Sequence, residues 1–481
     1  MSNVPSEQRS DIQTSSSQSS TPSSLSTTNS KHIVILGGGF AGIGVLKNLQ
    51  KEFHNYGNIE ITLIDQDNFF LFTPMLPEVA SGMIETRHIV TPVRSFCKKA
   101  KFYEAKIQDI DLKNNKIDIS HKIGRQHDHD NSLEDCNDND DPDQNSGGDS
   151  HKHTIPYDHL VIALGNENNF FGNTDIELNS FTLKSITDAI KLRNHLIKIL
   201  EQVNLEQDNK DLRKSLLTFV VVGGGFSGVE AVGSINDFIR DSVKRYYKNI
   251  LMSEIRVILV SATDKILEQI DEDLGNFALS KLQAKGVDFI FNKKVKEVTQ
   301  ENATLDDGTI IPTYSLIWTA GVSPSKLVAN LECEHDKSHR ILTNEYLEVK
   351  DYEGVVYALG DCASTPNPNT GKPYPPTAQH AIKQSEIVSK NIVLSIKRRE
   401  KENQSKKKRK INYKTRGMMA QIGKRNGVAI LFGKIRLHGF LAWWLWRTYY
   451  LTNLPTANKK LKVVGDWTFD LLFKPDVSQI H

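Results

Sequence analysis

The sequence predicts an α/β protein with two similar βαβ domains and a separate C-terminal region. Residues 33–44 (IVILGGGFAGIG) and 219–230 (FVVVGGGFSGVE) each read as a buried strand, a G-x-G-x-x-G turn and the start of a helix. From about residue 411 the composition changes, and this stretch holds every tryptophan except Trp318. Together these observations predict two Rossmann-like dinucleotide-binding domains followed by a region with a different role.

Composition narrows the class of protein. The 481 residues allow two or three domains, and 60 basic residues against 58 acidic ones give no reason to expect nucleic-acid binding. Acidic residues gather in 128–149 and basic residues in 397–410, and such blocks of like charge are usually solvated. Four scattered cysteines without a C-x-x-C pair predict an intracellular, reducing environment.

Two segments are of low complexity. The first 30 residues lack the patterns of a signal or transit peptide, which predicts a disordered tail. Residues 121–153 form an insertion with five histidines, for which a hydrophilic loop is favoured over a metal-binding tract, so no metal site is expected. Strand-like residues on either side, 115–120 and 157–165, predict that this insertion caps a hairpin. No run of about 18 apolar residues occurs, so no transmembrane helix is expected.

The first glycine turn has the full pattern of a dinucleotide site. A strand over 33–36 leads into the turn, a helix runs to about residue 53, and a second strand over 59–64 ends at Asp65. The three glycines permit the tight turn, the approach of phosphate and the packing of helix on strand; they are Gly37, Gly39 and Gly42. The helix N-terminus favours phosphate, and the carboxylate of Asp65 suits both ribose hydroxyls.

The second turn repeats this frame. Its glycines are Gly223, Gly225 and Gly228. The strand after its helix, 255–260, ends at Ser261 instead of an acid, and no arginine stands beside it to hold a 2′-phosphate, although Lys265 is near. The sequence therefore favours NADH and leaves NADPH open.

Two dinucleotide sites in one chain predict that two cofactors meet. One would be held permanently and one would visit, so that a hydride passes between them. The alternative is a duplicated domain in which one site has become inactive.

Five further segments identify a family. They are LIDQDNFFLFTPMLPEVASG (63–82), IALGNENNFFG (162–172), IWTAGV (317–322), YALGDCA (357–363) and PPTAQHAIKQ (375–384). The chain, from about 31 to 475 without the insertion, resembles the type II (non-proton-pumping) NADH:quinone oxidoreductases of the flavoprotein disulfide-reductase superfamily. The last segment matches A-Q-x-A-x-x-Q, the most specific of the set. The resemblance implies a respiratory-chain enzyme that passes a hydride from NADH to FAD and two electrons to a membrane quinone.

The resemblance also implies the residues of each cofactor site. For FAD these are Gly37, Gly39, Phe40, Ala41, Gly42, Asp65, Thr73, Pro74, Ile107, Ala163, Gly165, Gly360, Asp361 and Ala378. Thr73 and Pro74 would lie against the flavin ring, Ile107 near the adenine, and Asp361 beside the ribityl chain. For NADH they are Gly223, Gly225, Phe226, Ser227, Gly228, Ala320 and Gly321.

Two residues are candidates for a catalytic role. Glu230, expected in the first helical turn, would be within reach of the nicotinamide; its alternative role is to interact with the helix dipole. Gln379 would line the quinone site with Ile382 and Lys383. Isoleucine stands where some relatives have histidine, so no protonating histidine is expected, and a helix would turn His380 away from Gln379.

The C-terminal region is expected to reach the membrane. The segment FLAWWLWRTYYL (440–451) is too short to span a bilayer and favours a helix at the membrane interface, with Trp443 and Trp446 inserted into the lipid. The alternative is a helix buried in the core or in a dimer interface. The basic run 397–410 could attract anionic lipid. We expect a peripheral protein on the cytoplasmic face of the cell membrane, and the resemblance leaves a homodimer open.

The predicted organisation has five parts. They are a tail (1–30), a first part of the FAD domain (31–185, with the insertion 121–153), an NAD(P)H domain (186–330), a second part of the FAD domain (331–410) and the membrane-associating region (411–481). There are two alternative functions. A sulfide:quinone oxidoreductase-like enzyme needs two reactive cysteines, for which only Cys136 and Cys333 are candidates. A non-catalytic NAD(H)-sensing flavoprotein would show no turnover.

Overall fold

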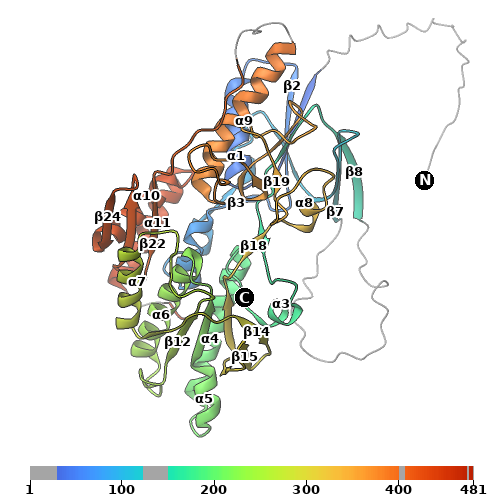
Figure 1. The fold of residues 1–481 in the computed structure, drawn as a ribbon. Coiled ribbons are helices and arrows are strands. Elements are labelled where there is room, and N and C mark those ends of the chain that lie inside the picture. The colour runs from blue at the N-terminus through green and yellow to red at the C-terminus, as the bar shows by residue number, and fades with distance from the viewer. Residues whose placement is uncertain (1–29, 123–149, 400–406, 474–475, 480–481) are drawn as a thin grey trace, which may run out of the picture.

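The first βαβ unit belongs to a five-stranded parallel sheet. The computed structural model describes residues 30–122, 150–399, 407–473 and 476–479, so almost all of the predicted tail lies outside the described residues. The strand order is β20-β9-β1-β2-β5. The strands are β1 (Lys31–Leu36), β2 (Ile59–Asp65), β5 (Lys101–Glu104), β9 (His159–Ile162) and β20 (Val356–Ala358). Helix α1 (Phe40–Glu52) follows the first glycine turn and packs beside α9 (Ala378–Arg399), as Figure 1 shows.

The second βαβ unit builds a four-stranded parallel sheet in the order β13-β12-β11-β17. The strands are β11 (Thr218–Val222), β12 (Arg256–Val260), β13 (Val287–Ile290) and β17 (Ser315–Trp318), and the helices include α4 (Ile186–Leu205), α6 (Phe226–Tyr246) and α7 (Glu272–Ala284). All five residues of β11 are buried, as expected for a β-branched strand covered on both faces. Both predicted units are thus present as two parallel sheets.

The predicted hairpin at the insertion is present, but its second strand differs from the prediction. Strand β7 (Lys116–Lys122) pairs with β6 (Lys106–Asp111) and with β8 (Ser150–Pro156), which begins inside the predicted insertion. The stretch 157–165 instead contributes β9 to the first sheet. Among the classified residues of β8 only Ile155 is buried, so hydrophobic alternation could not reveal this strand. Residues 123–149 lie outside the described residues.

The histidines near this hairpin do not make a metal centre in the described part of the chain. The ring of His121 stacks on that of His153 with centroids 5.3 Å apart, and His127 and His129 lie outside the described residues. Over the residues that the structure describes, no group of three or more His, Cys, Asp or Glu could hold a metal ion.

The C-terminal region is an antiparallel sheet with two helices. It consists of β22 (Gly417–Gln421), β23 (Gly427–Leu431), β24 (Ile435–Gly439), α10 (Phe440–Asn453) and α11 (Ala457–Leu472). Strand β22 lies against α6 and β23 against α7, so this region is docked on the second domain (Figure 1). None of the helices in the described ranges is long and apolar enough to cross a bilayer.

Candidate functional site

The first glycine turn joins β1 to α1, and its geometry requires glycine at both ends. Gly37 has a φ of +101°, and a Cβ there would lie 2.3 Å from the carbonyl oxygen of Ala163. A Cβ on Gly42 would lie 1.8 Å from the carbonyl oxygen of Gly37. Around Gly39 a Cβ would meet nothing within 4 Å, and no side chain caps the N-terminus of α1. The free N–H groups at this open end suit a pyrophosphate.

Asp65 ends β2 and directs its carboxylate to this turn. Its Oδ2 accepts the N–H of Gly38, and its Oδ1 accepts the N–H of Asp67 at 2.8 Å. Burial raises the pKa of Asp65 above its usual range. Ile107 lies on β6, two residues beyond Ala105, whose N–H donates to the carbonyl oxygen of Asp65 at 2.9 Å. The predicted ribose acid and the predicted adenine-side isoleucine are therefore neighbours.

The carboxyl ends of β1, β9 and β20 meet at one edge of the first sheet. The predicted residues that follow these strands are Gly37, Ala163, Gly165, Gly360 and Asp361. A Cβ on Gly360 would lie 3.3 Å from the Cβ of Ala41, and the N–H of Gly360 donates to Oε1 of Gln384 at 2.7 Å. The structure thus brings predicted FAD residues from three distant segments together.

Other predicted FAD residues reach the same region. Thr73 and Pro74 form a short 3-10 helix, η1 (Thr73–Met75), and the ring of the preceding Phe72 lies 5.6 Å from that of Phe40 at the start of α1. Ala378 is the first residue of α9, the helix that packs beside α1. The open helix end, the carboxylate of Asp65 and the glycine-lined edge of the sheet together fit FAD.

A partly buried lysine near Asp361 was missed by the sequence reasoning. The ammonium group of Lys184 donates to Oδ1 of Asn166, and Nδ2 of Asn166 donates to Oδ2 of Asp361 at 3.0 Å. Burial lowers the pKa of Lys184 and raises that of Asp361, and each charge opposes the other's shift. The only sequence feature near Lys184 is a helix-capping pattern, which does not point to a cofactor site. Ser185 and Asp188 form a capping box that fixes the backbone at Lys184.

The second glycine turn has the same build. Gly223 has a φ of +120°, a Cβ on Gly228 would lie 1.9 Å from the carbonyl oxygen of Gly223, and a Cβ on Gly225 would meet nothing within 4 Å. Phe226 and Ser227 are the first two residues of α6. Ser261 follows β12 at the place of an acid, and its Oγ lies 3.2 Å from Oγ1 of Thr263. The second site therefore offers a hydroxyl pair where the first offers a carboxylate.

The two domains are connected by a short ladder. Strand β10 (Glu167–Asn168) follows Gly165 on the FAD side, and β18 (Val322–Ser323) follows Ala320 and Gly321 on the NADH side. Glu167 pairs with Ser323 in this antiparallel ladder. The segments predicted to border the flavin and the nicotinamide thus lie side by side.

Glu230 lies in a different position from the one expected. It is the fifth residue of α6, and no acidic residue occupies the first turn of that helix, so the alternative role at the helix dipole is not supported. Its Oε1 accepts the N–H of Gln421 at 3.1 Å and Nε1–H of Trp446 at 2.9 Å. Burial is the main cause that raises the pKa of Glu230 to about 8, and the nearby charge of Glu78 adds to it. The carboxyl group is therefore protonated at neutral pH.

Glu78 and Arg447 form a buried ion pair that the sequence did not reveal. Nη2 of Arg447 lies 3.2 Å from Oε1 of Glu78, and Nε1 of Trp467 donates to Oε2 of Glu78 at 3.1 Å. The guanidinium carbon of Arg447 lies 4.2 Å from the ring centroid of Trp443 and 4.5 Å from that of Trp467. The stacked Arg447 side chain thus holds the C-terminal region against α2 (Leu76–Ala80), the helix that contains Glu78.

The predicted quinone residues occupy one side of α9. Gln379, Ile382 and Lys383 follow the three- and four-residue spacing of a helix face, and all are partly buried. Nε2 of Gln379 donates to the carbonyl oxygen of Gly417 at 3.2 Å, while Nζ of Lys383 pairs with Oε1 of Glu386 at 2.7 Å. His380 is buried, and burial lowers its pKa.

Strand β22 links the two candidate catalytic residues. Its first residue, Gly417, accepts the bond from Gln379, and its last residue, Gln421, donates to Glu230. Four residue steps along a strand span about 13 Å. Glu230 and Gln379 are thus held by opposite ends of one strand.

Comparison with known proteins agrees with this geometry. A family model described as pyridine nucleotide-disulphide oxidoreductase matches residues 31–385, and one described as NDH2 C-terminal domain matches residues 415–476. A probable NADH dehydrogenase of Dictyostelium discoideum is 33% identical over 93% of this chain and 90% of its own length. The external NADH-ubiquinone oxidoreductase 2, mitochondrial, of Saccharomyces cerevisiae is 30% identical over 91% of this chain and 80% of its own.

Solved structures share the fold. The structure of NDH2 from Plasmodium falciparum in complex with NADH gives a TM-score of 0.78 at 20% identity and covers 93% of this chain and 99% of that chain. The sulfide:quinone oxidoreductase of Aquifex aeolicus gives a TM-score of 0.62 at 17% identity, with 94% and 96% covered. At these identities the likeness concerns the fold alone.

Proposed function

The chain belongs to the type II NADH:quinone oxidoreductases of the pyridine nucleotide-disulphide oxidoreductase superfamily, and we propose from this premise how it works. It takes a hydride from NADH onto FAD and passes two electrons to a membrane quinone, without pumping protons. NADH is the favoured donor, and NADPH stays open because Ser261 replaces the usual acid. One observation carries the proposal: two glycine turns of the same build are present, and the β10–β18 ladder joins the segment after β9 in the first domain to the segment after β17 in the second.

The chain's own residues would bind the cofactors and exclude water. When bound, FAD supplies the ring that accepts the hydride and passes on the electrons. Asp65 would hold the adenosine ribose, Asp361 the ribityl chain, and Lys184 would place a positive charge beside Asp361. The NADH pyrophosphate would lie at the N-terminus of α6, which no side chain caps.

Glu230 would hold a proton near the reacting atoms. Its carboxyl group is neutral at pH 7, because its pKa is about 8, and Trp446 and Gln421 fix one oxygen in place. The two ends of β22 contact Glu230 and Gln379, so this proton lies about 13 Å along the strand from the proposed quinone residues. Gln379, Ile382 and Lys383 would line that site, the amide as a hydrogen-bonding group and the isoleucine as an apolar wall.

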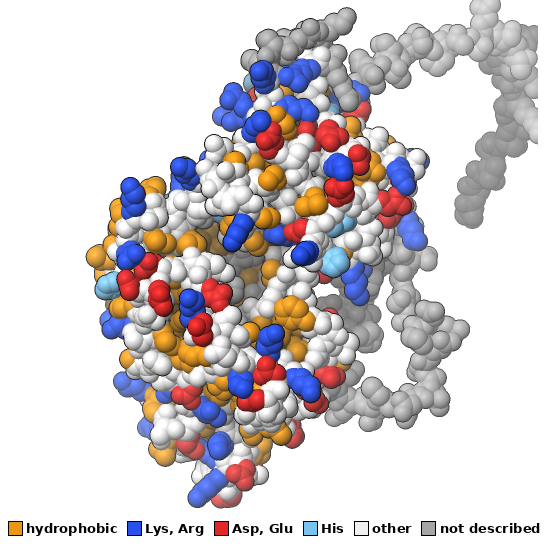
Figure 2. Space-filling view, in the orientation of Figure 1, with side chains coloured by type: hydrophobic (Ala, Val, Ile, Leu, Met, Phe, Trp, Pro, Cys, Tyr) orange, Lys and Arg blue, Asp and Glu red, His pale blue; other side chains and the backbone are white. Residues whose placement is uncertain are grey.

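A peripheral attachment to the membrane would bring this site to its lipid-soluble substrate. Figure 2 shows hydrophobic side chains gathered at the left edge of the molecule, over the C-terminal elements. Large apolar residues exposed in the C-terminal region include Phe432, Ile435, Phe440, Leu441, Trp444, Leu461, Phe469, Leu471, Leu472 and Phe473. Exposed apolar side chains gathered in this way suit lipid or a partner chain. A homodimer through the same region stays a prediction.

One expectation about this attachment needs correction. Trp443 and Trp446 are only 6% and 1% exposed, so the expectation that they insert into lipid is wrong, and Trp444 (55% exposed) faces outward instead. In the basic run 397–410, Lys408 forms an ion pair with Glu348 at 2.6 Å, so part of the positive charge of this run is neutralised within the protein. Residues 400–406 lie outside the described residues. The cytoplasmic face of the cell membrane stays a prediction that fractionation tests, since the yeast relative is named mitochondrial.

The rival functions have less support. A sulfide:quinone oxidoreductase-like enzyme needs a reactive cysteine pair, but burial raises the pKa of Cys333 to about 11 and this side chain packs against a hydrophobic cluster. Cys136 lies outside the described residues. A non-catalytic NAD(H)-sensing flavoprotein would bind both cofactors without turnover.

Anaerobic stopped-flow mixing tests the proposal. The purified yellow protein is mixed first with NADH and then with a soluble quinone, while flavin absorbance is followed. We expect bleaching by NADH and recovery with quinone. Bleaching without recovery would support the sensing flavoprotein, and a flavin that only sulfide reduces would support the rival enzyme; either result overturns the proposal.

A further inference from the structure

Helix α6 presents one continuous face to the C-terminal region. The face contains Glu230, Gly233, Asp237 and Asp241, which are three or four residues apart and so lie in one row. Opposite this row runs the turn 422–426 between β22 and β23, which follows directly on Gln421, the residue that donates to Glu230. Contacts along this row can therefore influence the hydrogen bond between Gln421 and Glu230.

The middle of the row is a close backbone contact. A Cβ on Gly233 would lie 2.7 Å from the backbone nitrogen of Gly423, so no larger residue fits between helix and turn. Gly423 has a φ of +79°, and a Cβ there would lie 2.3 Å from Oδ2 of Asp237. Both glycines thus allow the turn to rest directly on α6.

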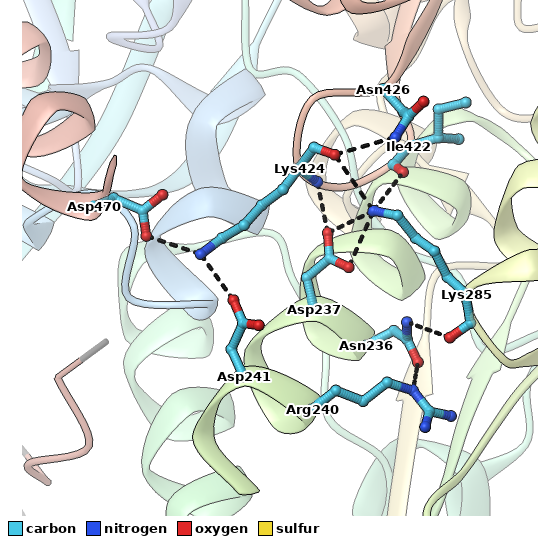
Figure 3. A network of polar contacts seen from close by, with 9 residues as sticks. All are labelled: Asn236, Asp237, Arg240, Asp241, Lys285, Ile422, Lys424, Asn426 and Asp470. Atoms are coloured by element: carbon cyan, nitrogen blue, oxygen red, sulfur yellow. Dashed lines mark hydrogen bonds and ion pairs between the residues drawn. The ribbon is translucent and has the colours of Figure 1, made fainter. Parts of the chain in front are cut away.

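Charged groups lock this contact, as Figure 3 shows. Oδ2 of Asp237 accepts the N–H of Lys424 at 2.5 Å and lies 2.8 Å from Nζ of Lys285. Nζ of Lys424 lies 3.0 Å from both Oδ2 of Asp241 on α6 and Oδ1 of Asp470 on α11. Burial works against the charge of Lys424, but Asp470 and Asp241 raise its pKa, so the lysine is charged wherever the protein is folded near neutral pH.

The lock acts on both donors of Glu230. Gln421 immediately precedes the turn, and α10, which carries Trp446, packs on the same sheet: a Cβ on Gly427 would lie 2.8 Å from the backbone nitrogen of Trp443. Sheet and helix therefore move together. We propose that Lys424 and Asp237 are positioning residues, which fix the turn 422–426 on α6 and so hold Gln421 and Trp446 on the carboxyl group of Glu230.

This inference deepens the proposed function and rests on it. If the lock opens, the partly buried Glu230 becomes more exposed to water, and its pKa falls from about 8 toward its ordinary value. The other titratable groups that interact with Glu230 are Glu78 on α2, which is paired with Arg447 on α10, and Tyr450 on α10. These groups are unchanged by a substitution at Lys424, so a shift in the titration reports the lock.

The test compares pH profiles of FAD-loaded variants. Lys424→Met removes the charge, Lys424→Arg keeps it, and Glu230→Gln marks which titration belongs to Glu230. The rate of flavin reduction by NADH and the thermal midpoint are each measured against pH. We expect Lys424→Met to move the titration near pH 8 down by at least about one pH unit, and Lys424→Arg to restore it.

A matched control separates positioning from general stability. Arg213 and Glu254 form another partly buried ion pair of the second domain, with 3.0 Å between Nη2 and Oε1. Arg213→Met should lower the thermal midpoint but leave the titration in place. If Lys424→Met fails to fold, Asp470→Asn, which removes one of the two carboxylates on Lys424, takes its place.

The outcomes distinguish the inference from the function beneath it. A titration that disappears in Glu230→Gln but is unmoved in Lys424→Met and Asp470→Asn would overturn the positioning role alone. A titration that persists in Glu230→Gln would show that it belongs to another group, and both the role of Glu230 and the inference would fail.

Discussion

Replacing Glu230 by glutamine tests the burial of its carboxyl group. The glutamine of the Glu230→Gln variant keeps an acceptor oxygen for Nε1–H of Trp446 but cannot ionise. In the wild-type protein this nitrogen lies 2.9 Å from Oε1 of Glu230. In the wild-type protein the folded pKa is about 8 against an ordinary value of 4.5, so the folded state holds more protons than the unfolded state between these pH values. Stability must therefore fall as the pH rises through this window, and the glutamine variant lacks this loss.

The expected size follows from the pKa. One pKa unit corresponds to about 1.4 kcal/mol, so a rise from 4.5 to about 8 sets an upper limit of about 5 kcal/mol. Unfolding entropy is about 2.1 cal/mol/K per residue, or about 1 kcal/mol/K for 481 residues. Between about pH 5 and about pH 9 the wild-type Tm should thus fall by up to about 5 °C more than that of the variant.

Thermal unfolding of the FAD-loaded proteins, followed by tryptophan fluorescence across this pH range, measures the effect. Burial also raises the pKa of Glu78, Asp65 and Asp361, and these groups lower the stability of both proteins alike. The difference between the two Tm curves therefore isolates Glu230. Curves that run parallel over the whole range would refute a buried, neutral Glu230.

Three further variants test other parts of the site. Arg447→Met should cost about 3–5 kcal/mol in thermal or chemical unfolding, because Glu78 would stay buried without its counter-charge. Trp444→Ser combined with Leu441→Ser should reduce co-flotation with lipid vesicles, since a fully buried apolar side chain contributes about 1.5–3 kcal/mol. Ile382→Glu should slow reoxidation of reduced flavin by quinone at least about tenfold, equivalent to about 1.4 kcal/mol, while reduction by NADH keeps its rate in stopped-flow traces.

Each of these has its own control. The double variant Glu78→Gln, Arg447→Met should recover part of the lost stability; a loss as large as in Arg447→Met would mean that charge is not the cause. Leu205→Ser removes an 83% exposed leucine at the end of α4 and should leave vesicle binding unchanged. For Ile382→Glu, equal slowing of both half-reactions would speak against a quinone site on this face of α9.

The parts of the fold that the sequence predicted depend on local patterns. The buried strand, the glycine turn and the helix start stand next to one another in the chain, and the strand predicted at the start of 219–230 is part of β11. The bond between Arg447 and Glu78 joins residues 369 positions apart, and no local pattern marks either one. Lys184 was missed for the same reason, because Asn166 and Asp361 reach it from other segments.

Composition identified the aromatic helix but not its orientation. Three of the five tryptophans lie within 440–451, yet only Trp444 of these is exposed. Which side faces inward is decided by the carboxyl groups of Glu78 and Glu230, because an indole N–H or a guanidinium group is needed where a carboxyl group is buried. Those two acids lie far from α10 in the sequence, so periodicity within 440–451 could not predict the orientation.

Helix α10 therefore has two different tasks on its two sides. Its inner side, with Trp446 and Arg447, covers Glu230 and Glu78; Glu78 is buried and Glu230 is partly buried. Its outer side carries Leu441 and Trp444, which we propose to lie in lipid. Because a helix of fourteen residues moves as one body, a displacement at the membrane side also displaces the donors of Glu230. The lock at Lys424 opposes such a displacement, since it ties the sheet beneath α10 to α6 and α11.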